Sequence, residues 1–334
     1  MHRNKITIAV HFLQTNKKFL PVLNRRQIRI KVMQSIYAMH QSGSDNLEKQ
    51  EKFLLNSIEN SLDLYLILIT ILPELQKKEI DFIEKSKLKH LATPEEKNPN
   101  LKFVNNAIFS FLEDNNALSI ALEKHKVNNW QANDDLILSL LQEVKQSDLY
   151  QNYMVSKTSG FNEDRDFVIN LFEKVIAPNE ILYHYLEDFK LTWIDDIPVV
   201  NTLILKQLGQ LSAKENSFKI PPTYKDQDDK DFAISLFRKT VLNEEKLAKE
   251  FSDKTPNWDI SRIAEIDTIV LKMAICELLN FASIPTKVTM NEYLEIVKEY
   301  STPKSSVFIN GILDTLVKDF HTNNKLNKVG RGLL

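Results

Sequence analysis

Glycine is scarce in this chain of 334 residues: it occurs six times, and no two glycines in the body of the chain lie close together. Loops that cradle phosphates, of the GxGxxG or GxxxxGK type, need clustered glycines so that the backbone can approach the ligand. The sequence therefore excludes Rossmann-type dinucleotide binding and P-loop nucleotide chemistry.

Cysteine is almost absent, since Cys276 is the only one. A single cysteine excludes an internal disulfide framework and a CxxC zinc or redox site, and it favours a reducing compartment. The seven histidines are scattered and form no HExxH pair, which argues against a zinc protease. We therefore expect neither a metal nor a cofactor.

Long apolar runs are missing as well. The longest run, residues 64–72, is too short to span a bilayer and ends at Pro73. Residues 6–13 are apolar but lack a small-residue cleavage site, so no signal peptide is predicted. The expected location is the cytoplasm.

Charge, by contrast, is present but unevenly distributed. Residues 1–44 hold eight of the 43 Lys and Arg residues and none of the 45 Asp and Glu residues, and after Asp319 the chain is basic again. An acidic body with a basic head and tail is common in proteins that bind a polyanion at one place. A solvated basic arm without a ligand has the same composition, so charge alone leaves both interpretations open.

Apolar residues recur at helical spacing along most of the chain, and no convincing strand alternation is present, so an all-α protein is predicted. A T-x-x-E capping box at Thr289 and Glu292 predicts a helix start there, and Pro73 predicts a helix end. The expected helices cover about 24–41, 47–72, 73–91, 101–125, 133–155, 164–189, 196–211, 263–280, 291–300 and 303–320.

An internal repeat relates residues 164–193 to residues 229–258 at a constant offset of 65, with eleven of thirty positions identical. One residue of insertion later, Thr202, Leu205 and Lys206 match Thr268, Leu271 and Lys272. Most shared positions are apolar, as any packed helix pair requires, but the shared aspartates and tryptophan make chance a poor explanation. We infer a duplicated helical unit.

Arg25, Arg26 and Arg29 fall in the first turns of the predicted helix 24–41. Cations at a helix N-terminus oppose the macrodipole, so this arrangement does not help folding. A phosphate docked there would be stabilised by the side chains and by the free N–H groups.

The C-terminal third holds further unusual residues. Glu277 lies beside the apolar stripe of helix 263–280, where it either reaches water or meets a partner or a neighbouring helix. Gly311 in the last helix is expected to permit close helix packing. Lys304 and Ser305 precede that helix at a position that favours anions, although a plain N-cap explains the serine equally well.

Taken together, these segments resemble the NusB family of bacterial transcription antitermination factors. The head LNRRQIRIKVMQSIYAMHQS is similar to the arginine-rich first helix of that family, and IPTKVTMNE and FINGILD match two of its specific elements. The resemblance is loose over residues 23–90 and close over 226–320. It implies a NusB-like helical bundle, which is enlarged here.

The resemblance divides the chain into five parts: an extension (1–22), N-terminal helices with the arginine-rich first helix (23–92), a helical insertion with a degenerate repeat at 164–211 (93–225), the C-terminal half (226–320) and a basic tail (321–334). The first repeat copy has no counterparts of NEYLE and FINGILD. We therefore expect the insertion to be structural or to engage another partner.

The family resemblance also implies a function. Family members bind single-stranded boxA elements of ribosomal RNA leaders together with the ribosomal protein NusE, and the pair joins the RNA polymerase antitermination complex. Carried over by position, the RNA-binding residues are Arg25, Arg26, Arg29, Gln34, Lys304 and Ser305. The residues expected at the NusE contact are Tyr37, Glu277 and Asp314.

Two other functions remain to be weighed. NusB-like domains also precede a methyltransferase domain in ribosomal RNA cytosine methylases, but that chemistry needs a glycine-rich cofactor loop and a nucleophilic cysteine, which Cys276 in a packed helix does not supply. No enzyme activity is therefore expected. The second alternative is a helical protein–protein scaffold that has lost RNA binding.

Overall fold

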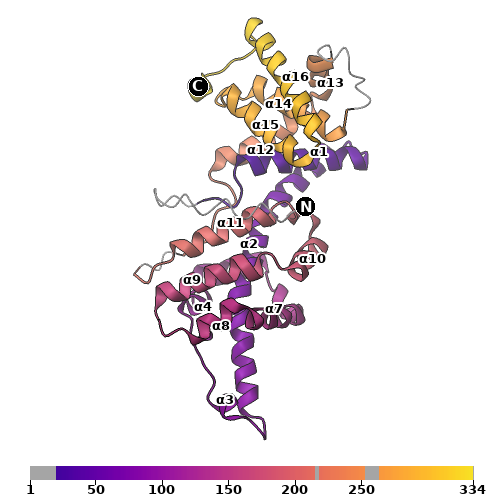
Figure 1. The fold of residues 1–334 in the computed structure, drawn as a ribbon. Helices are drawn as coiled ribbons and strands as arrows, with labels where there is room; N and C mark the ends of the chain where they lie inside the picture. Colours follow the sequence, from indigo (N-terminus) through magenta and orange to yellow (C-terminus); the bar gives the residue numbers. More distant parts are fainter. Residues whose placement is uncertain (1–19, 215–217, 253–262, 334) are drawn as a thin grey trace. The chain divides into compact units, whose positions relative to one another are not determined.

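The computed structural model describes residues 20–214, 218–252 and 263–333, and every regular element within them is a helix (Figure 1). The prediction of an all-α protein is confirmed. The predicted extension lies almost entirely outside the described residues, as does Trp258 of the repeat.

The chain forms two compact units. The first contains residues 59–223 with the segment that ends at Val22, and the second joins residues 23–58 to residues 224–334. One boundary between the units falls inside a helix, between residues 58 and 59, and residues 59–92 lie in the same unit as residues 93–223. The cause is visible at Ile67, which is buried and whose carbonyl accepts a hydrogen bond from the Trp130 indole at 3.0 Å.

Helix α2 (Leu47–Lys87) contradicts the predicted break, because it continues past Pro73. A proline inside a helix costs about 3 kcal/mol or more. All nine residues of the run 64–72 are buried, however, and burial of one large apolar side chain stabilises by about 1.5–3 kcal/mol. Packing along this run therefore outweighs the proline.

Among the described helices, α2 is also the one long and apolar enough to cross a membrane by length and composition alone. Two thirds of its apolar window are buried inside the protein, as is usual for a core helix. Its hydropathy therefore reflects packing within the fold.

The first unit is built mainly from short helices. Phe103 lies at its centre and contacts the rings of Phe109, Tyr150 and Phe167 at centroid distances of 5.0, 5.3 and 6.1 Å. Apart from α2, its helices are α3 (Pro94–Lys97), α4 (Ala107–Glu113), α5 (Asn116–His125), α6 (Asn129–Ala132), α7 (Asp134–Gln146), α8 (Asp148–Val155), α9 (Phe161–Leu171), η1 (Phe172–Ile176), α10 (Glu180–Phe189), η2 (Leu191–Trp193) and α11 (Ile197–Gln210).

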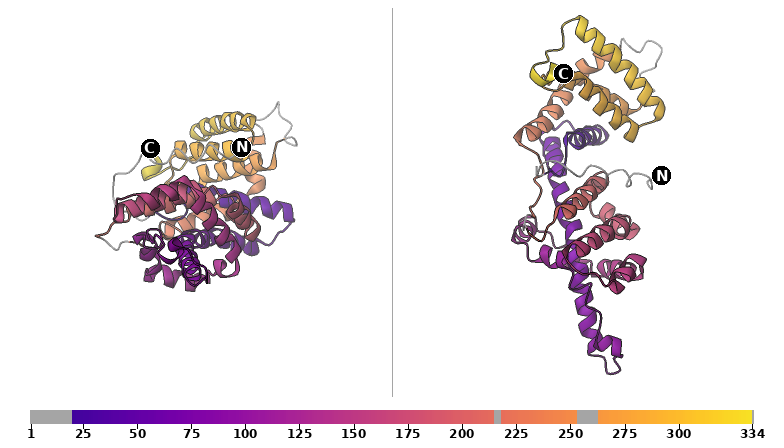
Figure 2. Two further views of the ribbon diagram at one scale, coloured as in Figure 1. Left: turned by 60° about the horizontal axis from the view of Figure 1, so that its bottom comes forward. Right: turned by 60° about the vertical axis from the view of Figure 1, so that its left-hand side comes forward.

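The second unit combines α1 with the C-terminal helices. Helix α1 packs against α12, α14 and α15, and the views in Figures 1 and 2 show α14, α15 and α16 side by side. The helices are α1 (Arg25–Ser42), α12 (Gln227–Val241), α13 (Glu244–Ser252), α14 (Glu265–Asn280), α15 (Thr286–Tyr300), α16 (Pro303–Thr322) and η4 (Gly330–Leu333).

The ends of α1 follow from local chemistry. The Asn24 side chain accepts hydrogen bonds from the backbone N–H groups of Arg26 and Gln27, as an N-cap does. Gly43 closes the helix with φ of +59°, a conformation that glycine adopts without steric cost. The predicted start and end of this helix are thus correct within one residue.

The capping box predicted at Thr289 and Glu292 does not form. Helix α15 starts earlier, at Thr286 after Pro285, so both residues lie inside the helix. Their side chains bind other helices instead: the Thr289 hydroxyl donates to Glu277, and Glu292 accepts from Arg26. Thr289 and Glu292 therefore make tertiary contacts and do not cap their own helix.

Candidate nucleic-acid interface

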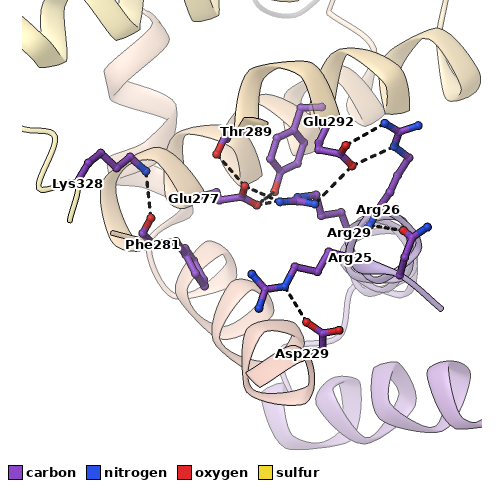
Figure 3. Close-up of polar contacts among 11 residues, drawn as sticks. Arg25, Arg26, Arg29, Asp229, Glu277, Phe281, Thr289, Glu292 and Lys328 are labelled. Atoms are coloured by element: carbon purple, nitrogen blue, oxygen red, sulfur yellow. Dashed lines mark hydrogen bonds and ion pairs between the residues drawn. The ribbon is translucent and has the colours of Figure 1, made fainter. Parts of the chain in front are cut away.

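The first turn of α1 carries two part-exposed arginines. Arg25, with a side chain 40% exposed, donates from Nε to Asp229 Oδ1 of α12 at 2.7 Å and lies over the Phe232 ring at 5.1 Å (Figure 3). Arg26, 38% exposed, donates from Nε and Nη2 to the two oxygens of Glu292 on α15 at 3.0 and 2.9 Å. Helix α1 is thereby attached to both α12 and α15.

The hydrogen bonds and charge of Glu292 raise the pKa of Arg26 above its ordinary value, against a smaller opposing effect of burial. A cation so paired keeps its charge but offers less of it to an external anion, because the carboxylate already neutralises it. Any polyanion at this helix end must therefore compete with Asp229 and Glu292.

Arg29 lies one turn further along α1, in the interior of the unit. Its side chain is 2% exposed, and Nε and Nη2 donate to the two oxygens of Glu277 on α14 at 2.8 Å each (Figure 3). Glu277 is fully buried and also accepts from the hydroxyls of Thr289 at 2.8 Å and Tyr293 at 3.2 Å. The buried charges are thus paired and hydrogen-bonded, as a low-dielectric interior requires.

Burial alone would lower the pKa of Arg29, but the hydrogen bonds and charge of Glu277 outweigh it and raise the pKa above its ordinary value. Burial and the Glu277 charge likewise raise the pKa of Tyr293. The sequence predicts Arg29 as an RNA contact and Glu277 as a NusE contact. In the structure, instead, the two side chains enclose each other between α1 and α14, so neither offers a surface to a ligand.

Gln34 and Tyr37 lie further along α1. Tyr37 is 38% exposed and stands eleven residues after Arg26, about 20° away around the helix axis. Gln34 is half-buried and stands eight residues after Arg26, about 80° away. Arg26 and Tyr37 therefore share one side of α1, with Gln34 turned away from it.

Lys304 and Ser305 lie at the start of α16. Thr302 is the N-cap and accepts from the Ser305 backbone N–H at 3.1 Å, while the two hydroxyls lie 2.9 Å apart. Lys304 is exposed. Thr302, and not Ser305, therefore caps α16, and Lys304 lies at the surface.

One side of α16 is open to solvent. Val307 is 76% exposed, Asn310 and Gly311 are exposed, and Asp314 accepts from the Asn310 amide at 3.3 Å. These residues follow the spacing that puts side chains on one helix face. The close packing expected at Gly311 is absent, because a Cβ there would meet no atom within 4 Å in the described part of the chain.

Cys276 is fully buried, and burial raises the pKa of its thiol to about 11. A thiolate, not a thiol, is the nucleophile. Cys276 therefore serves packing in α14, as its sequence context predicts.

Three residues with a clear role were not predicted as part of this interface. Asp229, Phe232 and Glu292 hold the arginines, yet each looks like an ordinary residue in its own segment. The available signal was the repeat, in which Asp229 is identical to Asp164 and Phe232 to Phe167. The same acid at equivalent positions of the two copies indicates a similar role for its charge or its hydrogen bonds.

Comparisons with known proteins find a family match in the C-terminal part of the chain. A family model described as "NusB family" matches residues 200–318, which include α12, α14 and α15 but not α1. No solved structure matches the chain.

Three curated relatives share the name transcription antitermination protein NusB. That of Salinibacter ruber is 44% identical over 113 residues, which are 34% of this chain and 71% of the relative. Those of Chloroherpeton thalassium and Clostridium kluyveri are 38% and 37% identical over 105 and 91 residues, which are 31% and 27% of this chain and 50% and 58% of the relatives. With such identity over more than two thirds of the first relative, the chain belongs to the NusB family of transcription antitermination factors.

Proposed function

We propose that this protein acts in the cytoplasm as a non-enzymatic antitermination adaptor that binds boxA-type single-stranded RNA of ribosomal leaders together with NusE. The pair would join RNA polymerase and let it read through terminators. One observation carries the proposal: the first turn of α1, with two part-exposed guanidinium groups, packs against the helices of the family match.

The proposed RNA contacts are Arg25 and Arg26, with Lys304 from the start of α16 and the Gln34 amide as a reader of a base edge. Ser305 is a weaker contact, since its backbone N–H is bonded to Thr302. Arg29 is assigned a supporting role, because its pair with Glu277 fixes α1 so that the first turn is presented to the ligand.

The proposed NusE surface is the open face of α16 with Tyr37 of α1. An exposed valine beside a glycine that packs on nothing in the described chain suits close approach by a partner. Asp314 adds a charge to this face. Glu277 is buried and would act on the partner only through α14.

The test measures binding of a leader RNA with a boxA element, in the presence of NusE from the same organism, as a function of salt. Each lost phosphate contact reduces the log–log salt slope by about 0.7, so Arg25→Ala combined with Arg26→Ala should reduce it by about 1.4. Arg29 is left intact because its removal would leave the buried Glu277 carboxylate without its cation and destabilise the fold. Arg238→Ala is the matched control, since Arg238 is an exposed arginine paired with Glu51 in the same unit.

Unchanged affinity and slope in the double variant, with helical circular dichroism preserved, would refute this assignment. It would favour the alternative of a scaffold that no longer binds RNA. Deleting most of the first unit would not serve as the test, because α2 contributes to both units.

A further inference from the structure

The segment 325–333, here called the C-terminal strap, lies against the end of α14. The Val329 N–H donates to the carbonyl of Ala282 at 3.0 Å, and Lys328 Nζ donates to the carbonyl of Phe281 at 3.1 Å (Figure 3). Lys325 Nζ binds both oxygens of Glu250 at 2.9 Å. The strap is therefore held by backbone and side-chain bonds.

Two glycines let the strap reach this position. Gly330 has φ of +54°, and Gly332 is buried so closely that a Cβ would lie 1.9 Å from the Ala282 carbonyl oxygen. The sequence VGRG thus fits the end of α14 in a way that a larger residue at Gly332 would prevent. The strap places Lys328 and Arg331 beside the residues that end α14.

Phe281 stands at the centre of this region. Its half-buried ring meets the ring of Phe232 edge-on at 5.3 Å, and Lys239 Nζ lies 5.4 Å from its centroid. Phe232 in turn lies 5.1 Å below the Arg25 guanidinium. A continuous series of contacts, from Arg25 through the Phe232 and Phe281 rings, therefore leads from the first turn of α1 to the strap.

The cations at the two ends of this series of contacts differ in how far their charge is neutralised. Arg25, Arg26 and Arg29 each have a carboxylate partner. Lys239, Lys328 and Arg331 have none among the residues that the structure describes, and Lys239 and Arg331 are exposed. Two cations without a carboxylate partner, Lys239 and Lys328, thus contact Phe281, whereas each arginine of the predicted cluster is paired.

We propose that Lys239, Phe281, Lys328 and Arg331 form a second RNA contact, here called the strap patch, that binds the single strand continuing from the first turn of α1. The cations contact phosphates, and one base stacks on Phe281. An aromatic ring between cations is the pattern by which proteins hold single strands without strict sequence preference. This inference rests on the proposed RNA-binding function and extends its site.

The experiment uses the full chain and a single-stranded leader RNA of about 20 nucleotides that contains the boxA element, long enough for both contacts. Lys239→Ala combined with Arg331→Ala should lower the salt slope by about 1.4, as expected for two lost phosphate contacts. Phe281→Leu, which keeps an apolar group against Phe232, should weaken binding by about tenfold through lost stacking. Lys246→Ala with Lys318→Ala is the matched control, since both are exposed lysines on other helices of the same unit.

Gly332→Val tests the strap itself, because it should displace the strap and weaken binding as much as removing its cations. Urea unfolding shows whether each variant is folded. Reduced RNA affinity in the lysine–arginine variant but not in Phe281→Leu would overturn the stacking of a base on Phe281. If the strap variants bind RNA like the control while Arg25→Ala with Arg26→Ala still weakens binding, the strap patch is overturned and the first RNA contact stands. A wild-type chain that binds no RNA overturns the proposed function itself.

Discussion

The two copies of the internal repeat keep the same framework around different chemistry. In the second unit, α1 packs on α12, Asn24 caps α1, and Asp229 accepts from Arg25, the first residue of that helix. In the first unit, α4 packs on α9, Asn106 caps α4, and Asp164 accepts from the backbone N–H of its first residue, Ala107, at 3.0 Å. Helix α4 thus stands to α9 as α1 stands to α12.

Counting from these caps, the positions of Arg25, Arg26 and Arg29 hold Ala107, Ile108 and Phe111 in the first unit. At the offset of 66 that relates α11 to α14, Leu211 takes the place of Glu277. The same helix packing therefore persists without the three arginines and without Glu277, although the equivalent of Asp229 is kept as Asp164. The comparison teaches that the apolar framework and this aspartate suffice for the packing, while the arginines and Glu277 serve another purpose.

The largest expected effect is at the buried pair. Glu277→Ala removes the buried carboxylate that binds Arg29 through two hydrogen bonds and leaves only the longer ion pair with Glu292 at 3.6 Å, and this should cost about 3–5 kcal/mol of unfolding free energy. Replacing both residues by apolar ones, Arg29→Met with Glu277→Leu, imitates the first unit and should recover most of the loss. Urea unfolding measures both, and a double variant as unstable as Glu277→Ala would break the comparison.

Asp164 should matter for stability alone. Its carboxylate accepts from the Tyr153 hydroxyl at 2.6 Å as well as from Ala107. Asp164→Ala leaves these donors without that partner and should cost about 1–3 kcal/mol. Leader-RNA affinity should stay at the wild-type value, and a clear decrease in a folded variant would assign RNA contact to the first unit.

Gly311→Ala separates folding from partner binding. Alanine is favoured over glycine inside a helix by about 0.8–1 kcal/mol, and the described chain leaves room for the methyl group. Unfolding should therefore become harder, while NusE binding measured by calorimetry should weaken. Stabilisation with unchanged NusE affinity would remove α16 from the proposed partner surface.

The smallest effect on stability is expected at Asp229, the counterpart of Asp164. Its ion pair with the part-exposed Arg25 should contribute no more than about 1 kcal/mol. Asp229→Ala releases the guanidinium, so RNA affinity should increase while stability changes little. Reduced affinity would show that Asp229 positions Arg25 for RNA.

The sequence predicted what local rules decide. Helical periodicity indicated the all-α fold, and Asn24 and Gly43 indicated the ends of α1, because each acts on its immediate neighbours. It failed at Pro73 and at Thr289, where packing and a contact from another helix overrode the local pattern. Local signals do not contain the environment that a helix meets after folding.

For the site, residue type indicated charge but not its surroundings. Arg25, Arg26 and Arg29 look alike in sequence, yet two reach the surface and one is enclosed, because successive turns of α1 meet different neighbours. Whether Glu277 reaches water or meets a neighbouring helix depends on Arg29 of α1, which lies 248 residues earlier in the chain. Such pairing requires the tertiary fold.

That separation has a consequence for synthesis on the ribosome. Helix α1 is made early, but the carboxylate that neutralises Arg29 follows only after the whole first unit has been translated. Contacts between such distant segments form slowly, and domains generally fold as they emerge. We therefore expect α1 of the nascent chain to stay unpacked until α14 has been synthesised, because the unpaired Arg29 guanidinium opposes burial of the helix. The first unit can meanwhile assemble its own core.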